Sequence, residues 1–149
     1  MISFSPYLVY NGDCEEAFNF YKTVFGCESL YIGRYKDVPD EARKFFPNAN
    51  AEHVMHATLQ LNERTAIMGN DNPDIDERSL SSVPRDFYIY LDIDLPEKAT
   101  RVFNELSDNG QIIVPIAHTF WCNCYGAVTD KFGINWKVTS HGNDHASTS

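Results

Sequence analysis

The chain has 149 residues, of which 43% are hydrophobic and 22% are charged, which is typical of one soluble globular domain and excludes a largely disordered chain. Its 12 basic residues stand against 21 acidic ones, for a formal net charge of −9, and no cluster of Lys and Arg suits a nucleic-acid backbone or an anionic membrane surface. No apolar run approaches the roughly 18 residues that a transmembrane helix needs.

The first half of the chain predicts a strand, a helix and three further strands. Residues 2–10 are rich in aromatic and β-branched side chains, which favours a strand. Apolar residues then recur at helical spacing over 14–25, between Asp13, a good N-cap, and Gly26, at the position that ends a helix. Residues 37–50 contain a short helical turn bounded by two prolines. The three further strands are expected over residues 28–35, 53–61 and 64–69.

The second half repeats this order after a polar, proline-containing loop over residues 70–85. A strand is predicted over 86–94, and a helix follows between Pro96 and Gly110, with apolar side chains at helical spacing. The polar residues 140–149 predict a disordered tail. Three more strands are expected over residues 111–114, 119–129 and 134–139.

These elements predict one α+β domain over residues 1–139, built from two βαβββ modules. Module one covers residues 1–69, the loop covers 70–85, and module two covers 86–139. One such module leaves a face of its sheet bare, so we expect the two modules to pair edge to edge. The result would be a curved, mostly antiparallel eight-stranded cup with the helices outside.

Alternation within the strands assigns side chains to the two faces of a sheet. We expect the apolar rows to pack on the helices and the mixed rows to line the inside of the cup. Aromatic side chains with a few polar groups are the usual composition of a ligand site, although a solvated sheet face or a dimer interface shows the same alternation. The candidate ligand-binding residues are His56, Tyr88, Tyr90, Asp92, Trp121, Tyr125, Asn135 and Lys137.

Four stretches of the chain carry a resemblance to a known family. They are PYLVYNGDCEEAFNFYKTVFG, HVMHATLQLNERTAIMGND, FYIYLDID and FWCNCYGAVTDKFGINWKV. Together they resemble the PhnB-like branch of the vicinal-oxygen-chelate superfamily, which includes glyoxalase I, bleomycin-resistance proteins and extradiol dioxygenases. The resemblance covers about residues 4–139. It implies paired βαβββ modules that assemble as a homodimer.

The resemblance also implies a metal site, which the residues at the matching positions do not support. Metal-dependent members place four ligands, typically His and Glu, on four strands at the centre of the cup. The residues at the matching positions of this chain are poor ligands for a divalent ion, and the lysine among them would add a positive charge where a cation should lie. We therefore expect no metal and no other cofactor. The matching positions are Pro6, Met68 or Gly69, Tyr88 and Lys137.

Proteins of this branch often carry a demethylubiquinone methyltransferase label. In this sequence, no Gly-rich loop follows a strand and opens a helix in the way that a nucleotide-type cofactor needs. An antiparallel, cup-like sheet also differs from the parallel α/β sheet of such transferases. The sequence therefore argues against methyl transfer.

The sequence leaves open whether the chain catalyses any reaction. His56 is the best catalytic candidate, as a general base near neutral pH. His53 lies three residues earlier on the same predicted strand, so it points to the opposite face and could share a metal with His56 only if a bulge intervened.

The cysteines and the first residues indicate a cellular location. The chain opens without the basic segment of a signal peptide, and its cysteines are typical of reduced thiols rather than of a disulfide framework. We therefore expect a cytoplasmic protein. The cysteines are Cys14, Cys27, Cys122 and Cys124.

Three hypotheses about function follow. The first is a metal-free homodimer that binds a small aromatic or cationic molecule by stacking, with the net acidity favouring a cation. The alternative is a metal-dependent lyase, isomerase or dioxygenase of the same superfamily, with ligands that the sequence does not reveal. The third is a dimer whose cup is filled by its own loops. Neither a nucleic acid nor a membrane is expected as a partner.

Overall fold

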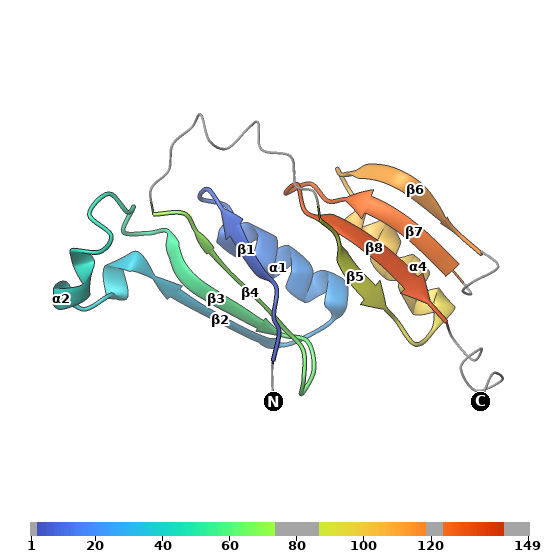
Figure 1. Cartoon of the computed structure of the whole chain (residues 1–149), viewed down its shortest axis with the longest axis horizontal. Helices are drawn as coiled ribbons and strands as arrows, with labels where there is room; N and C mark the ends of the chain where they lie inside the picture. Colours follow the sequence, from blue (N-terminus) through green and yellow to red (C-terminus); the bar gives the residue numbers. More distant parts are fainter. Residues whose placement is uncertain (1–2, 74–86, 119–123, 142–149) are drawn as a thin grey trace. The chain divides into compact units, whose positions relative to one another are not determined.

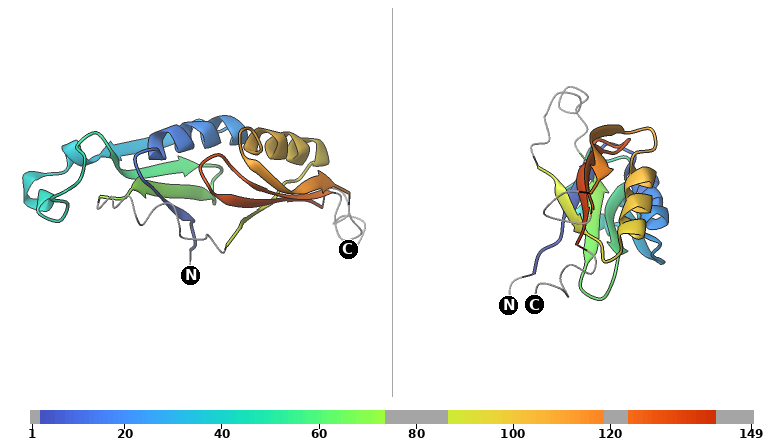
Figure 2. Two further views of the ribbon diagram at one scale, coloured as in Figure 1. Left: turned by 90° about the horizontal axis from the view of Figure 1, so that it is seen from above. Right: turned by 90° about the vertical axis from the view of Figure 1, so that its right-hand side faces the viewer.

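The computed structural model describes residues 3–73, 87–118 and 124–141. The chain divides into two compact units, Met1–Val83 and Pro84–Ser149. Each unit holds its own four-stranded sheet, and one long helix packs along one face of that sheet (Figure 1; Figure 2).

The first unit contains four strands, one long helix and two short helical turns. Its elements are β1 Tyr7–Tyr10, α1 Cys14–Phe25, β2 Ser29–Arg34, the 3-10 turn η1 Tyr35–Asp37, α2 Asp40–Arg43, β3 Val54–Gln60 and β4 Ala66–Asp71. The strand order is β1-β4-β3-β2. Strand β1 is parallel to β4, and the other neighbours are antiparallel.

The second unit repeats this topology with four strands and one helix. Its elements are β5 Ile89–Asp92, α4 Pro96–Leu106, β6 Gln111–Ala117, β7 Cys124–Thr129 and β8 Asn135–Ser140. The order is β5-β8-β7-β6, again with one parallel pair, β5 and β8, and antiparallel neighbours elsewhere. The chain is therefore α+β, as predicted, and consists of two βαβββ modules.

Helix α1 begins and ends at the predicted residues, but its first turn is capped by a different side chain. Gly26 has a φ of 65° and closes the helix in the left-handed conformation. Asp13 stands at the N-cap position, but its side chain makes no capping hydrogen bond. The carboxylate of Asp71, at the end of β4, instead accepts a hydrogen bond of 3.0 Å from the N–H of Cys14. The N-cap position of Asp13 is confirmed, but its side chain does not accept the capping hydrogen bond, because β4 supplies the acceptor.

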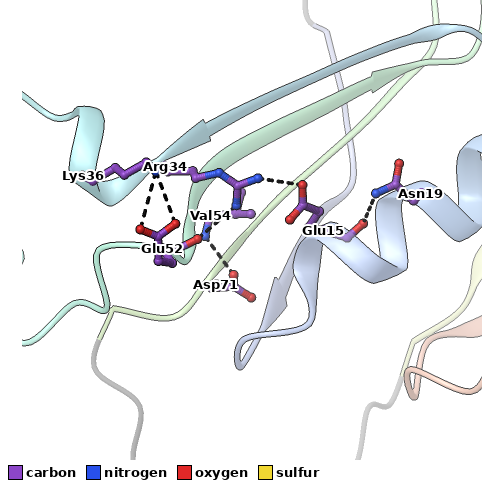
Figure 3. Close-up of polar contacts among 7 residues, drawn as sticks. All are labelled: Glu15, Asn19, Arg34, Lys36, Glu52, Val54 and Asp71. Carbon is purple, nitrogen blue, oxygen red and sulfur yellow. Dashed lines mark hydrogen bonds and ion pairs between the residues drawn. The ribbon is translucent and has the colours of Figure 1, made fainter.

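Asp71 also ties further segments of the first unit together. Its carboxylate accepts hydrogen bonds from the N–H of Gly12 at 2.8 Å and from the N–H of Val54 at 2.9 Å. Close by, the Arg34 guanidinium donates to the Glu15 carboxylate at 2.7 Å, which joins β2 to α1 (Figure 3). These contacts fix the start of α1 on three strands of the sheet.

The core of each unit lies between its helix and its sheet. Gly69 allows the close approach of α1, because a Cβ at this position would lie 2.5 Å from the carbonyl oxygen of Leu8 and 2.9 Å from the ring of Phe18. The largest fully buried side chains of the first unit are Leu8, Tyr10, Phe18, Tyr21, Val24, Val54 and Leu59. Those of the second unit are Val102, Phe103, Leu106, Ile134 and Trp136.

Several strand ends differ from the prediction. Strand β1 begins at Tyr7 rather than at residue 2, because its pairing with β4 begins there. Strand β5 is likewise limited to Ile89–Asp92, where it pairs with β8. Three strands run further than expected, because each continues to pair with its neighbour. These are β4, β6 and β8, which end at Asp71, Ala117 and Ser140 instead of at residues 69, 114 and 139.

Some predictions fall on residues that the structure does not describe. These are the first five residues of the strand expected over 119–129, most of the loop expected over 70–85, and all but the first two residues of the tail expected over 140–149.

Candidate functional site

Each sheet has one face against its helix and an opposite face that this helix leaves uncovered. Along β1, Leu8 and Tyr10 are each 2% exposed, whereas Tyr7 and Val9 are 47% and 46% exposed. We call the uncovered faces the first and the second open face. The first open face contains Tyr7, Val9, Tyr31, His56, Thr58, Met68 and Asn70. The second open face contains Tyr88, Tyr90, Asp92, Tyr125, Asn135, Lys137 and Thr139.

His56 is the predicted residue of the first open face, and it lies at the centre of a hydrogen-bonded row. Its Nδ1 is 3.2 Å from the Tyr7 hydroxyl, and its Nε2 is 2.9 Å from Thr58 Oγ1. The ring centroids of Tyr7 and His56 are 5.6 Å apart. Burial raises the pKa of Tyr7, and the nearby Cys14 adds to this effect, so the Tyr7 hydroxyl remains protonated at neutral pH.

Sequence reasoning missed Tyr7 and placed Pro6 at this point of the first strand. In the structure Pro6 precedes β1, and its carbonyl oxygen accepts a hydrogen bond of 2.9 Å from the N–H of Met68. The side chain that shares a face with Met68 is Tyr7, its register partner in β4. Alternation with Leu8 was the signal that could have found it.

His53 is separate from His56. It precedes β3, and its ring lies against Gly12, where an added Cβ would be 3.2 Å from the ring. Its Nδ1 is buried without a hydrogen-bond partner. The two histidines therefore do not form a joint site.

The second open face brings together the predicted residues of β5, β7 and β8. Tyr90 is the register partner of Lys137, and Asp92 is that of Thr139. The Lys137 Nζ lies 4.8 Å from the centre of the Tyr88 ring. Tyr88 and Tyr90 are 40% and 56% exposed, so aromatic surface is available beside the ammonium group.

Two predicted residues of this face are occupied by contacts within the unit. The Asn135 Oδ1 accepts a hydrogen bond of 2.6 Å from Thr129 Oγ1, and the Asn135 amide nitrogen donates to the carbonyl oxygen of Phe87 at 3.2 Å. Asp92 Oδ1 lies 3.0 Å from His141 Nδ1. Lys137 and the tyrosines are thus the groups of this face that are best placed to meet a ligand.

Trp121 belongs to the predicted site but lies outside the described residues. Its role stays a prediction. Tyr125 lies on β7 across from Thr139 and is half-buried.

The residues at the implied metal positions do not fit a divalent ion. Gly69 faces α1, so the fourth strand offers the Met68 thioether to the first open face. The first unit therefore presents Tyr7 and Met68, and the second presents Tyr88 and Lys137. Phenol, thioether and ammonium are not donors that a hard divalent cation selects. Within residues 3–73, 87–118 and 124–141, no group of three His, Cys, Asp or Glu could hold a metal ion.

The turns from strand to helix do not fit a nucleotide-type cofactor, which needs free N–H groups at the start of a helix. Before α1, the N–H groups of Gly12 and Cys14 already donate to the buried Asp71 carboxylate. Helix α4 begins with Pro96, which has no N–H, and Asp94 precedes it with a negative charge.

No helix in the described part of the chain is long and apolar enough to cross a membrane.

Comparisons with known proteins place the chain in a family. The family model described as 3-demethylubiquinone-9 3-methyltransferase matches residues 2–139. Protein YjdN of Escherichia coli is 30% identical over 140 residues, which cover 90% of this chain and 92% of that protein.

Two solved structures are similar to this chain over nearly its whole length. Protein PA1353 from Pseudomonas aeruginosa is 30% identical, with a TM-score of 0.78 over 95% of this chain and 99% of that one. The PhnB protein from Bacillus cereus is 24% identical, with a TM-score of 0.72 over 93% of this chain and 99% of that one, and it is similar in fold. The chain belongs to the family whose model is described as 3-demethylubiquinone-9 3-methyltransferase.

Proposed function

We propose that this chain is a small-molecule-binding protein that works without a metal, as a homodimer. The observation that carries the proposal is the aromatic character of the open faces. Tyr7, Tyr31, Tyr88 and Tyr90 expose 40% to 59% of their surface there, beside a small number of polar groups. Exposed rings next to a few polar side chains are the usual composition of a ligand site.

The hydrogen bonds of the His56 ring favour ligand binding over general-base catalysis. Both of its ring nitrogens already have partners, Tyr7 and Thr58. A general base needs a free nitrogen within hydrogen-bond reach of the substrate. The metal-dependent alternative is not favoured, because Tyr7, Met68 and Lys137 are unsuited to a divalent ion.

Edge strand β6 supports a homodimer. Ile112, Ile113 and Val114 are 50%, 45% and 38% exposed, and Gln111–Ala117 carries no charged side chain. Exposed apolar rows of this kind mark protein interfaces. Because a net charge of −9 makes two copies repel each other, an uncharged strip is the surface on which they would meet.

A cytoplasmic location is part of the same proposal. Among the described residues the free cysteines are Cys14, Cys27 and Cys124, and the first and last of these are buried. Free thiols are typical of a reducing compartment.

A thermal-shift screen of small aromatic compounds tests ligand binding. A ligand that binds only the native state increases the free energy of unfolding by mass action, by about 2.7 kcal/mol at a concentration of 100 Kd. The melting temperature rises as a result. Tyr90→Ala should reduce the shift of a ligand that binds the second open face. Phe45→Ala is the matched control, since Phe45 is 70% exposed outside both open faces. Equal shifts in the wild type and Tyr90→Ala would count against this site.

Two measurements test the remaining parts of the proposal. Elemental analysis of protein purified without chelators should find no stoichiometric Ni, Zn, Fe or Mn, and one metal per chain would overturn the metal-free proposal. Sedimentation equilibrium should give a dimer that Ile113→Glu weakens. Ser29→Glu adds the same charge at an exposed position of β2 and should leave the dimer intact. A wild-type monomer would refute the homodimer.

A further inference from the structure

Lys137 is an unusual residue for the middle of a sheet. It lies in β8, an inner strand between β5 and β7, and it is half-buried. Its Nζ lies over the ring of Tyr88, at 4.8 Å. No carboxylate of the described residues lies within ion-pair distance of this ammonium group. A half-buried charge without an opposite charge is costly, so it calls for a partner.

Neither register neighbour of Lys137 carries a negative charge. Its register partner in β5 is Tyr90, and its register partner in β7 is Ala127. Asp92 is the acidic residue of the second open face within the described part of the chain, and its Oδ1 lies 3.0 Å from His141 Nδ1, a contact that is an ion pair only when the histidine is protonated. Within the described residues, the ammonium group of Lys137 therefore lies beside the exposed rings of Tyr88 and Tyr90, and the acidic group of this face lies at the next register position, at Asp92.

We propose that the second open face binds a small aromatic anion, with the negatively charged oxygen at Lys137 and the ring against Tyr88 and Tyr90. This inference rests on the proposed function, and it names the class of ligand. It reverses the preference for a cation that the net charge suggests. Charges spread over a surface are screened beyond about 8 Å at physiological ionic strength, so the ammonium group within the site decides the preference.

Three probes of the same shape and different charge test the inference. They are 1-naphthoate, the neutral 1-naphthamide and the cationic 1-naphthylmethylamine. Amide spectra of the isotope-labelled full chain report binding residue by residue and give each dissociation constant. We expect 1-naphthoate to shift the signals of β5 and β8 in a saturable way and to bind roughly tenfold more tightly than 1-naphthamide. The amine should bind most weakly.

Variants of Lys137 separate charge from shape. Lys137→Gln should remove the advantage of 1-naphthoate over 1-naphthamide, and Lys137→Arg should keep it, because only the latter retains the positive charge. Dispersed amide spectra of both variants show that they are folded. Raising the salt concentration should weaken 1-naphthoate binding in the wild type but not in Lys137→Gln.

The outcomes separate this inference from the proposed function. If 1-naphthylmethylamine binds β5 and β8 as tightly as 1-naphthoate, or if Lys137→Gln keeps the preference for the anion, the anionic ligand class is wrong and ligand binding stands. If none of the three probes shifts these signals, the anionic ligand class and the use of this face are both wrong.

Discussion

The indole Nε1 of Trp136 donates a hydrogen bond of 2.8 Å to Asp130 Oδ2 inside the second unit. Trp136 is fully buried, and Asp130 is 3% exposed. The other carboxylate oxygen, Oδ1, accepts hydrogen bonds from the N–H of Phe132 at 2.8 Å and from that of Ile134 at 3.0 Å. One buried carboxylate thus joins the turn between β7 and β8 to the largest side chain of the core.

We expect Asp130→Asn to lower the free energy of unfolding by about 2–4 kcal/mol. The amide keeps one oxygen, but its NH2 group then faces either the indole N–H or the two backbone N–H groups, and a buried donor is left without an acceptor. Urea denaturation followed by Trp fluorescence measures the change.

Asp108→Asn is the matched control for this prediction. Asp108 follows α4 and is exposed, so the same substitution should change the free energy of unfolding by less than about 0.5 kcal/mol. Equal effects of the two substitutions would show that the Asp130 hydrogen bonds contribute nothing specific.

Asp71 has a corresponding role in the first unit, and Asp71→Asn tests it locally. Its carboxylate accepts hydrogen bonds from three backbone N–H groups, those of Gly12, Cys14 and Val54. We expect a loss of about 2–3 kcal/mol, because the NH2 group of Asn replaces the oxygen that accepts either from Val54 or from Gly12 and Cys14. The amides that lose their acceptor should exchange their hydrogen faster. Asp37→Asn, at an exposed aspartate, should leave the exchange rates unchanged. Unchanged exchange in Asp71→Asn would refute this role.

The sequence predicted the order of the elements and the faces of several strands, because both follow from local spacing. Ala57 and Leu59 are fully buried, whereas His56 and Thr58 lie on the open face, as alternation requires. The pattern fails at the start of β3. There the register shifts between Gly33 and Arg34, and Val54 becomes buried while Met55 stays half-buried. A bulge inserts one residue, and alternation alone does not reveal it.

Contacts between distant residues could not be predicted in the same way. The cap of α1 comes from Asp71, 57 residues after Cys14, and the sequence offered the nearer Asp13. The hydroxyl partner of His56 comes from Tyr7, 49 residues earlier. Local spacing carries no information on such pairs, because they depend on which strands become neighbours in the sheet.

Two glycines in the first sheet should respond differently to the same substitution. Gly69→Ala should cost about 1–3 kcal/mol or more, because the added Cβ would lie 2.5 Å from the backbone oxygen of Leu8 and 2.9 Å from Phe18 in the core. At Gly33 the Cβ would meet the Tyr31 hydroxyl at 2.8 Å, at the end of an exposed side chain that can turn away. Gly33→Ala should therefore cost less than about 1 kcal/mol.

Thermal and urea denaturation of both glycine variants measure this difference. If Gly69→Ala is as stable as Gly33→Ala, α1 is not held against the sheet as closely as described.

The buried thiol of Cys14 leads us to expect a loss of stability at alkaline pH. Burial raises the pKa of its thiol, and the negative charge of Asp71 adds to this effect. The folded pKa therefore lies above the unfolded one, which is about 8.5 for a cysteine. Folding thus favours the protonated thiol, and this contribution is complete below the unfolded pKa and is lost as the pH rises towards the folded pKa.

The free energy of unfolding of the wild type should therefore fall more steeply than that of Cys14→Ala above about pH 8.5. Between about pH 8.5 and 10, the difference between the two proteins should change by roughly 1.5 kcal/mol. Urea denaturation at a series of pH values measures it. Cys27→Ala is the control. Burial raises the pKa of Cys27 too, but this thiol is only half-buried, and a backbone hydrogen bond and Lys22 act against the effect of burial, so the curve of Cys27→Ala should stay closer to that of the wild type. Parallel curves for the wild type and Cys14→Ala would contradict the prediction, since they would mean that the thiol titrates alike in the folded and unfolded chains.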